Sequence, residues 1–386
     1  MTSVSAGLRR SVPATVVHVS PTYFASESVI GGGERYAEEL CRAMSARVPV
    51  RFVSFGPRAV SERITDRFER VILKSWTRDR MTPFSPLFPA ALQGARVVHC
   101  YQLNTLPTFA AAVLSRLRGV PVFVSDLGGG GWTPGYHVNI ARWLSGHLPI
   151  SRYAAQKLPA GHVSSGVIYG GVDLEKFLPR EKLRHDGSVL FLGRILPHKG
   201  IHHLIEGLPA ERRLRVIGPI GSADYLNRLK SLAAGKRVEF VHGMSDTEVA
   251  DQLRRAAVLV HPTPTDSSGN AGASELLGLA VLEAMTSNCP VIVTRAASLP
   301  ELVEHGISGL VVPPNDPNAI GAAIQRVIAD FKFWMRLAVE GRNRVVTEFV
   351  WDKVVDRCLR AYGIVEATDP QRRVATAIDS MATRTF

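Results

Sequence analysis

The chain has 386 residues, of which 46% are hydrophobic and 21% charged, and its net charge is +12 at pH 7. This length suits two domains, and the composition is that of a globular protein rather than a disordered or membrane-spanning one. The positive charge favours anionic partners such as nucleotides or membrane surfaces, but it is dispersed and lacks an aromatic-interleaved basic motif, which argues against nucleic-acid binding.

In the first half, short β-branched runs alternate with helical patterns, which is typical of an α/β fold with a parallel sheet. Helices are expected at Glu34–Ala46 and Thr108–Leu117. The expected strands are Ala14–Val19, Val50–Phe55, Val97–Cys100, Val120–Ser125, Leu148–Pro149 and Gly166–Tyr169. The first half alone therefore predicts a complete doubly wound sheet.

The second half restarts the same pattern after a charged, aperiodic linker over Val172–Gly187. The expected strands are Ser188–Leu192, Leu214–Ile217, Val238–Phe240, Val258–His261, Val291–Thr294 and Gly309–Val312. The expected helices are Ile201–Leu208, Tyr225–Ala234, Asp246–Ala256, Leu279–Ser287, Leu299–Glu304 and Ala319–Asp330, and a last helical segment runs from about 338 to 362. We predict domains at 1–171 and 172–345, and a C-terminal segment at 346–386.

The four cysteines are widely spaced and form no CxxC pair, which argues against a zinc site and against a disulfide framework. No apolar stretch near the N-terminus is long enough for a signal peptide. We therefore expect a cytoplasmic protein, with any contact at the inner face of a membrane being peripheral.

A Gly-rich segment, Gly31–Tyr36, follows the first expected strand and opens a helix. Consecutive glycines such as Gly32 and Gly33 allow a phosphate or a sugar to approach the backbone, and the helix N-terminus supplies N–H donors. Because Tyr36 stands where a dinucleotide fingerprint needs its third glycine, a nicotinamide cofactor is disfavoured. A flexible turn without a ligand is the competing interpretation.

Two cations bracket the turn after the first strand of the second half. Arg194 directly follows that strand and Lys199 directly precedes a helix, so both side chains converge over the carboxyl end of the strand. There they would stabilise the negative charge that builds on a departing diphosphate. Two solvated surface charges are the competing interpretation.

Two glutamates eight residues apart follow the strand Val258–His261. Glu275 lies in the loop before a helix, and Glu283 lies within that helix among apolar neighbours. A carboxylate in such a helix is buried enough to need a partner. Each of the two glutamates is able to hold a diol, and N–H groups near Gly278 and Leu279 would face a diphosphate.

The order of these motifs resembles retaining glycosyltransferase family 4. The resemblance rests on the Gly-rich segment, the Arg194 and Lys199 motif, and the pair Glu275 and Glu283, and it covers nearly the whole chain. It implies the GT-B fold, with two Rossmann-like doubly wound domains facing across a cleft and a C-terminal helix that returns to the first domain.

The resemblance also implies residue roles. Arg194 and Lys199 would hold the diphosphate of a nucleotide-sugar donor. Glu275 would contact the sugar hydroxyls, and Glu283 would bind the ribose. The backbone near residues 243 and 244 would meet the base. The implied donor-site residues are Gly32, Gly33, Arg194, Lys199, Gly243, Met244, Glu275, Leu277, Gly278, Leu279 and Glu283.

The chain departs from the family pattern on the acceptor side. Asp126 stands where relatives commonly carry a histidine, so we expect it to be a catalytic residue that touches an acceptor hydroxyl or the donor sugar. The competing interpretation is that Asp126 only caps its Gly-rich turn. His137 is a further candidate.

The expected reaction moves a hexose from a UDP- or GDP-linked donor to an acceptor hydroxyl with retained anomeric configuration. No far-face nucleophile is evident, so the leaving phosphate would help to deprotonate the acceptor. We expect no cofactor and no essential metal, because an Asp-x-Asp signature is missing. An epimerase, a phosphorylase or a non-catalytic nucleotide-sugar binding protein are the alternatives.

The acceptor is the least defined part of the prediction. Aromatic residues Trp76, Phe84, Phe88 and Trp132, with prolines between 83 and 89, indicate a partly apolar loop region. This composition and the basic charge fit a lipid-linked acceptor at a membrane, and they also fit a small soluble acceptor.

Overall fold

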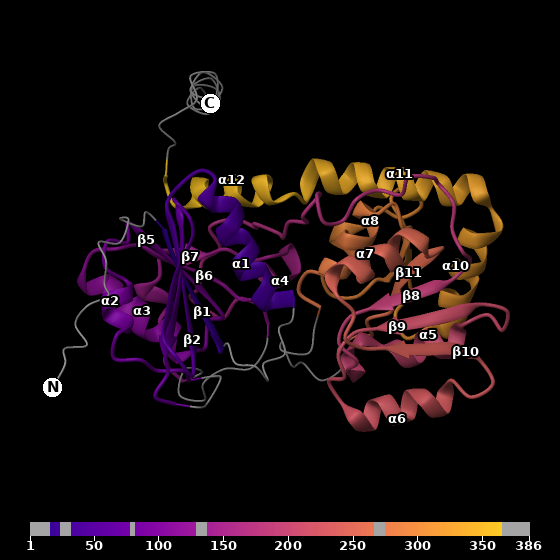
Figure 1. Cartoon of the computed structure of the whole chain (residues 1–386), viewed down its shortest axis with the longest axis horizontal. Helices are drawn as coiled ribbons and strands as arrows, with labels where there is room; N and C mark the ends of the chain where they lie inside the picture. Colours follow the sequence, from indigo (N-terminus) through magenta and orange to yellow (C-terminus); the bar gives the residue numbers. More distant parts are fainter. Residues whose placement is uncertain (1–15, 24–31, 78–81, 129–136, 266–274, 365–386) are drawn as a thin grey trace, which may run out of the picture.

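The computed structural model describes residues 16–23, 32–77, 82–128, 137–265 and 275–364, which form two α/β domains side by side (Figure 1). Each domain holds one mostly or wholly parallel sheet between helices, and the last helix extends from the second domain back over the first. This confirms the predicted fold class. None of the helices in these ranges is long and apolar enough to cross a bilayer.

The first domain contains a seven-stranded sheet in the order β3-β4-β2-β1-β5-β6-β7. All neighbouring strands are parallel except β3 and β4, which form an antiparallel hairpin at one edge. The strands are β1 (Val16–Tyr23), β2 (Val50–Gly56), β3 (Val60–Thr65), β4 (Phe68–Lys74), β5 (Val97–Tyr101), β6 (Val122–Ser125) and β7 (Gly146–His147). The helices are α1 (Gly32–Ser45), α2 (Phe88–Ala91), α3 (Leu106–Leu117) and α4 (Arg152–Gln156).

The second domain contains a six-stranded parallel sheet in the order β10-β9-β8-β11-β12-β13. Its order reverses between β8 and β11, and ligands of such sheets bind outside the carboxyl ends at this point. The strands are β8 (Val189–Leu192), β9 (Arg213–Ile217), β10 (Arg237–Val241), β11 (Val258–His261), β12 (Val291–Thr294) and β13 (Leu310–Val312). The helices are α5 (Ile201–Gly207), α6 (Ala223–Leu232), α7 (Asp246–Arg255), α8 (Leu279–Thr286), α9 (Leu299–Leu302) and α10 (Pro317–Ala329).

The C-terminal helical segment consists of two helices, α11 (Phe331–Glu348) and α12 (Trp351–Ala361), rather than one. The break falls at Phe349 and Val350, where a backbone bridge joins Val350 to Val172. The second helix buries one apolar face against the first domain, and the Trp351 ring lies edge-on to Tyr36 of α1 with 5.3 Å between centroids. The chain therefore crosses twice between the domains, and the two crossings lie next to each other.

Two fully buried histidines line the first sheet beneath α12. The hydroxyl of Tyr362 lies 2.6 Å from Nδ1 of His99, and Nδ1 of His18 lies 2.8 Å from the hydroxyl of Tyr101. Burial lowers the pKa of His18 to about 3 and holds that of His99 well below its usual range. Both rings are therefore neutral in the folded protein at neutral pH.

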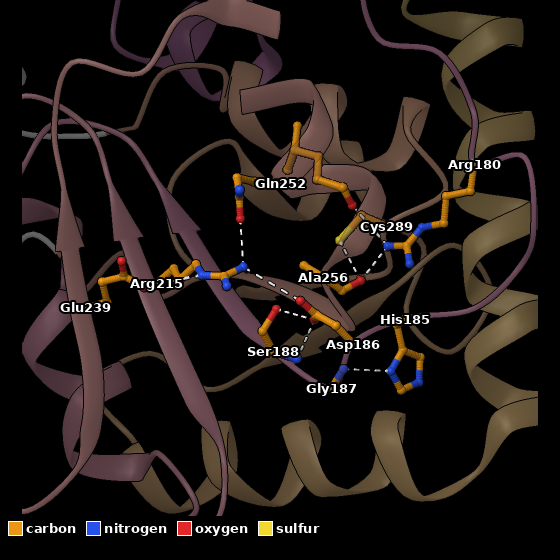
Figure 2. Close-up of polar contacts among 11 residues, drawn as sticks. Arg180, His185, Asp186, Gly187, Ser188, Arg215, Glu239, Gln252, Ala256 and Cys289 are labelled. Atoms are coloured by element: carbon orange, nitrogen blue, oxygen red, sulfur yellow. Dashed lines mark hydrogen bonds and ion pairs between the residues drawn. The ribbon is translucent and has the colours of Figure 1, made fainter. Parts of the chain in front are cut away.

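The linker between the domains is held against the second domain by buried Arg180 (Figure 2). Its guanidinium donates to the carbonyls of Leu253 and Ala256, at 3.0 and 2.5 Å, where α7 ends. The guanidinium also lies 5.1 Å from the ring centre of Trp334. Carbonyls at a helix C-terminus carry partial negative charge, which compensates the buried cation. From Arg180 onward the linker is therefore part of the second domain.

Three details of the first domain differ from the sequence prediction. The hairpin of β3 and β4 was not expected, because β3 is a polar and almost wholly exposed edge strand. The strand expected at Leu148–Pro149 is the two-residue β7 at Gly146–His147. No strand forms at Gly166–Tyr169, since Gly166 and Tyr169 both adopt positive φ, at 125° and 58°, which ends any extended run.

The buried histidines predict an acid-sensitive fold. The unfolded chain protonates His18 below about pH 6.5, whereas the folded protein resists this until about pH 3. The free energy of unfolding should therefore fall as the pH drops through this window, by up to about 1.4 kcal/mol per pH unit for one such group. Denaturant unfolding of the wild type and of His18→Gln between pH 7 and pH 4 measures this. In His18→Gln the free energy of unfolding should fall less steeply with decreasing pH than in the wild type. The control His137→Gln, at an exposed position, should follow the wild type.

Candidate functional site

The site lies at the carboxyl ends of β8 and β11, where the order of the second sheet reverses. A short 3-10 turn, Pro197–Lys199, follows β8, and Gly200 then adopts φ 69° before α5 begins. A Cβ atom at Gly200 would lie 2.0 Å from the carbonyl oxygen of Pro262, just after β11. Only glycine allows this approach, and it brings Lys199 against the segment that follows β11.

Lys199 forms an ion pair with Glu275, and both side chains are largely buried, with 14% and 13% of their surface exposed. Nε2 of His261, the last residue of β11, lies 3.3 Å from the same carboxylate oxygen. Nδ1 of His261 lies 3.0 Å from the hydroxyl of Thr263. The Nε2–H group of His261 is placed to donate to that carboxylate oxygen. The structure thus brings together the sequence-predicted residues Lys199 and Glu275.

The charges in this cluster are paired except for that of Arg194, among the residues that the structure describes. Burial alone would raise the pKa of Glu275, but the Lys199 ammonium and His261 hold it well below its usual range. Burial, then the Lys199 and Arg194 cations, lower the pKa of His198 to about 4. Arg194 itself is exposed, and no ion pair joins it to another residue that the structure describes. Arg194 is therefore open to an anionic ligand, whereas Lys199 meets one from within its pair with Glu275.

The backbone around Glu275 is fixed by the start of α9. Ser298 donates from its hydroxyl to the Glu275 carbonyl at 2.8 Å, and from its N–H at 3.3 Å. Gly278 then adopts φ 88° at the start of α8, and a Cβ atom there would lie 2.9 Å from Leu299. The segment 275–279 is therefore held on the second domain by α9, with the N-terminus of α8 at its end.

Three leucines of this segment pack against three glycines, two in the first domain and one at the hinge, the stretch from Tyr169 to Gly171 where the chain leaves that domain. A Cβ atom added to Gly128 would lie 3.2 Å from the side chain of Leu276. One added to Gly170 would lie 2.3 Å from Leu277, and one added to Gly32 would lie 3.5 Å from Leu279. Of the predicted site residues, Leu279 thus lies against Gly32 and Leu277 against Gly170, and a Cβ atom at Gly33 would lie 3.5 Å from Leu127. The Gly-rich start of α1 faces the start of α8 across the domain interface.

Glu283 lies apart from Glu275 and faces the first domain. Its carboxylate is 3.7 Å from the guanidinium of Arg35 in α1. Burial raises the pKa of Glu283, and Arg35 opposes this only in part. The same Arg35 pairs with Asp246 of α7 at 3.3 Å, and Asp246 also pairs with Lys176 of the linker. A cavity of about 10 Å³, lined by Arg35, Glu283 and neighbours, lies between the domains.

The remaining predicted residues lie around this region. Gly243 adopts φ 73° after β10, and the half-buried side chain of Met244 packs on the core. Asp126 caps its turn by accepting a hydrogen bond from the N–H of Gly128 at 3.0 Å, and burial raises its pKa. One carboxylate oxygen of Asp126 therefore caps the turn, as the competing interpretation of this residue expected. His137 is exposed, and Trp132 lies outside the described residues.

Sequence reasoning missed three residues that hold the site together. His261 ends a buried strand at the carboxyl edge of the sheet, and that position was a usable signal. Ser298 acts through a backbone carbonyl, and no local pattern predicts that contact. Arg35 was part of the Gly-rich motif, but its partner Glu283 is 248 residues away, and only the fold brings them together.

Comparison with known proteins is consistent with this geometry. A family described as "Glycosyl transferases group 1" matches residues 176–344, which lie almost wholly in the second domain. A GDP-mannose-dependent alpha-(1-6)-phosphatidylinositol monomannoside mannosyltransferase of Mycobacterium tuberculosis is 30% identical over 220 residues, covering 52% of this chain and 56% of that protein. The chain thus spans about half the length of the curated relatives it matches.

Solved structures cover more of the chain at lower identity. Anabaena HepE, solved with UDP and glucose, aligns with a TM-score of 0.68 at 17% identity, covering 91% of this chain and 100% of that one. Sucrose-phosphate synthase from Thermosynechococcus elongatus aligns with a TM-score of 0.70 at 21% identity, covering 94% and 100%. These similarities confirm the GT-B fold. The group 1 match adds that the second domain is similar to that of glycosyltransferases.

The buried pair predicts a measurable stability effect. Lys199→Met leaves the Glu275 carboxylate buried without its main partner, which should cost about 3 kcal/mol of unfolding free energy. Adding Glu275→Gln should recover part of that loss, because the remaining group is neutral. Denaturant unfolding of the wild type, both single variants and the double variant measures the coupling. Lys230→Met, at an exposed position, is the matched control, and an equal effect there would contradict the pairing.

Proposed function

We propose that this protein is a retaining glycosyltransferase of family 4, which transfers a hexose from a nucleoside diphosphate sugar to an acceptor hydroxyl. The observation that carries the proposal is the buried cluster of Lys199, Glu275 and His261 beside the open Arg194, at the switch point of a GT-B fold. Departure of the nucleoside diphosphate builds negative charge on its phosphates. Fixed cations in a partly dry site stabilise that charge without reorganising.

The donor is a UDP- or GDP-linked hexose in this proposal. Arg194 and Lys199 bind the diphosphate, Glu275 accepts hydrogen bonds from the sugar hydroxyls, and the backbone at Gly243 and Met244 meets the base. The names of similar proteins support both nucleotides, since one relative uses GDP-mannose and one neighbour was solved with UDP. Glu283 binds the ribose, for which its pairing with Arg35 must loosen.

Retention follows in this proposal from a front-face path. The leaving phosphate takes the acceptor proton while the acceptor oxygen approaches the same face of an oxocarbenium-like sugar. No protein nucleophile is then required, and the work of the protein is positioning and charge stabilisation. Asp126 contacts the acceptor hydroxyl with the carboxylate oxygen that does not cap the turn.

The acceptor is lipid-linked in this proposal. An apolar groove of about 160 Å³ lies in the first domain, lined by residues that include Phe55 at the end of β2 and Leu106 at the start of α3. Beside it, Trp76 is 71% and Leu87 is 54% exposed. Large exposed apolar side chains around a groove mark a binding surface. The acceptor of the mycobacterial relative, by its name, is a phosphatidylinositol mannoside.

The donor assignment is tested with Arg194→Ala. Release of UDP or GDP from a panel of nucleotide sugars should fall by about two orders of magnitude, as for loss of one charge-stabilising group, while the melting temperature stays close to that of the wild type. Exposed Arg213→Ala in the same domain is the control. Wild-type release should persist in a chelator, because no metal is required. Proton NMR of the product reads the retained configuration, and product formed without any acceptor would instead indicate an epimerase.

The acceptor assignment is tested by filling the groove. Ala110→Phe should raise the KM for a phosphatidylinositol acceptor in mixed vesicles on the order of tenfold, since the lost contacts are apolar. Hydrolysis of the donor without acceptor should be unchanged. Ala223→Phe, on the exposed start of α6, is the control. A soluble acceptor that is used equally well by wild type and Ala110→Phe would favour the small-molecule alternative.

A further inference from the structure

Glu301, on the short helix α9, connects the donor segment of the second domain to the first domain. One carboxylate oxygen accepts a hydrogen bond from the N–H of Arg152 at 2.8 Å, and the other accepts from the N–H of Tyr153 at 2.7 Å. The hydroxyl of Tyr169 donates to the same carboxylate at 3.2 Å. A single side chain therefore joins three donors that belong to the first domain and the hinge.

The carboxylate completes the N-terminal cap of α4. The first N–H groups of a helix have no partner within the helix. In α4 the hydroxyl of Ser151 accepts a hydrogen bond from the N–H of Ala154. The carboxylate of Glu301 accepts from the N–H groups of the two preceding residues, Arg152 and Tyr153. Glu301 is thus the acceptor, from the opposite domain, for two backbone donors at the domain interface. The positive end of the helix also favours a carboxylate at this position.

On its own domain, α9 is tied directly to the proposed donor site. Ser298, just before the helix, binds the backbone carbonyl of Glu275 through both its hydroxyl and its N–H. At the other end, the Arg344 guanidinium of α11 donates to the carbonyls of Leu302 and Glu301 at 2.7 and 3.0 Å. Helix α9 is thus bonded to its own domain at both ends, and Ser298 connects it directly to the backbone of Glu275.

Tyr169 stands where the chain leaves the first domain. It adopts φ 58°, an uncommon conformation for a bulky residue, and its carbonyl accepts from the hydroxyl of Tyr36 at 2.5 Å. The next residue, Gly170, lies under Leu277 of the donor segment. Downstream, the linker is held on the second domain from Arg180 onward. Glu301 therefore contacts the chain at the hinge itself.

We infer that Glu301 is a positioning residue. It fixes the donor segment 275–279 against the first domain, so that the sugar of the donor and the hydroxyl of the acceptor are held in the correct relative orientation. This inference rests on the proposed function. Glu301 is not placed to touch the reacting atoms, because its carboxylate is occupied by α4 and by Tyr169. Its influence passes through α9 to the carbonyl of Glu275.

The test is Glu301→Gln in the full chain, with Glu304→Gln as the matched control. Glu304 lies two residues after α9 ends, is exposed, and reaches Arg344 only at 3.8 Å. For Glu301→Gln we expect nucleoside diphosphate release with phosphatidylinositol vesicles to lose about tenfold in kcat, consistent with the loss of charged hydrogen bonds. The Kd for UDP or GDP should change less than about twofold, because those contacts lie within the second domain. Tyr169→Phe, which removes one of three bonds, should lose less.

A second measurement reads the contact itself. Hydrogen exchange at the N–H groups of Arg152 and Tyr153 should be at least about tenfold faster in Glu301→Gln than in wild type or Glu304→Gln, since the caps of α4 are lost. Exchange in the core strands should stay unchanged, which separates a local effect from general destabilisation.

The outcomes separate the two proposals. If wild type binds no nucleoside diphosphate and turns over no donor, the proposed function fails and the inference fails with it. If wild type is active but Glu301→Gln matches Glu304→Gln in kcat, only the inference is overturned. Equal losses in kcat and in nucleotide affinity would also overturn it, because they indicate a structural defect in the donor site rather than a positioning role.

Discussion

The second domain is organised around one buried negative charge. The Glu275 carboxylate is largely removed from water, and such a charge is tolerated only when it is paired and hydrogen-bonded. Lys199 supplies the pair and His261 the hydrogen bond, so the turn after β8 must approach the end of β11. Gly200 makes that approach possible, since no other residue fits against the Pro262 carbonyl. The close approach of the two segments at the switch point follows from this requirement.

The same pairing separates the roles of the two glutamates. Glu275 is compensated within its own domain, so its carboxylate stays ionised without a charged partner from the first domain. Glu283 is compensated across the interface by Arg35, more loosely, and its pKa lies above the usual range. A charge held at 3.7 Å by a partly exposed arginine is easily released to a competing ligand. The eight-residue spacing thus places one carboxylate in a rigid site and one at a domain contact.

Much of the second domain was predictable because central strands such as β11 and β12 are buried on both faces and form continuous apolar runs, as parallel strands do. Lys199 and Glu275 were predictable because both lie in loops at carboxyl ends. The β3–β4 hairpin was not, since an exposed polar edge has no apolar pattern, and the break at Phe349 and Val350 lacks the glycine or proline that marks a helix end. Contacts such as Arg35 with Glu283 depend on two chain crossings, which no local spacing encodes.

The contrast between the donor side and the acceptor side has a physical origin. Recognition of a diphosphate needs charge at defined points, and charge near a strand end is visible in a sequence. Recognition of an apolar chain needs only a shaped surface, and residues such as Phe84 and Leu106 fit a core, a loop or a groove equally well. The relative orientation of the two domains depends on still fewer distinctive residues, because the single carboxylate of Glu301 sets it by capping a helix of the opposite domain. The residues that align the two substrates are therefore the ones whose sequence signal is weakest.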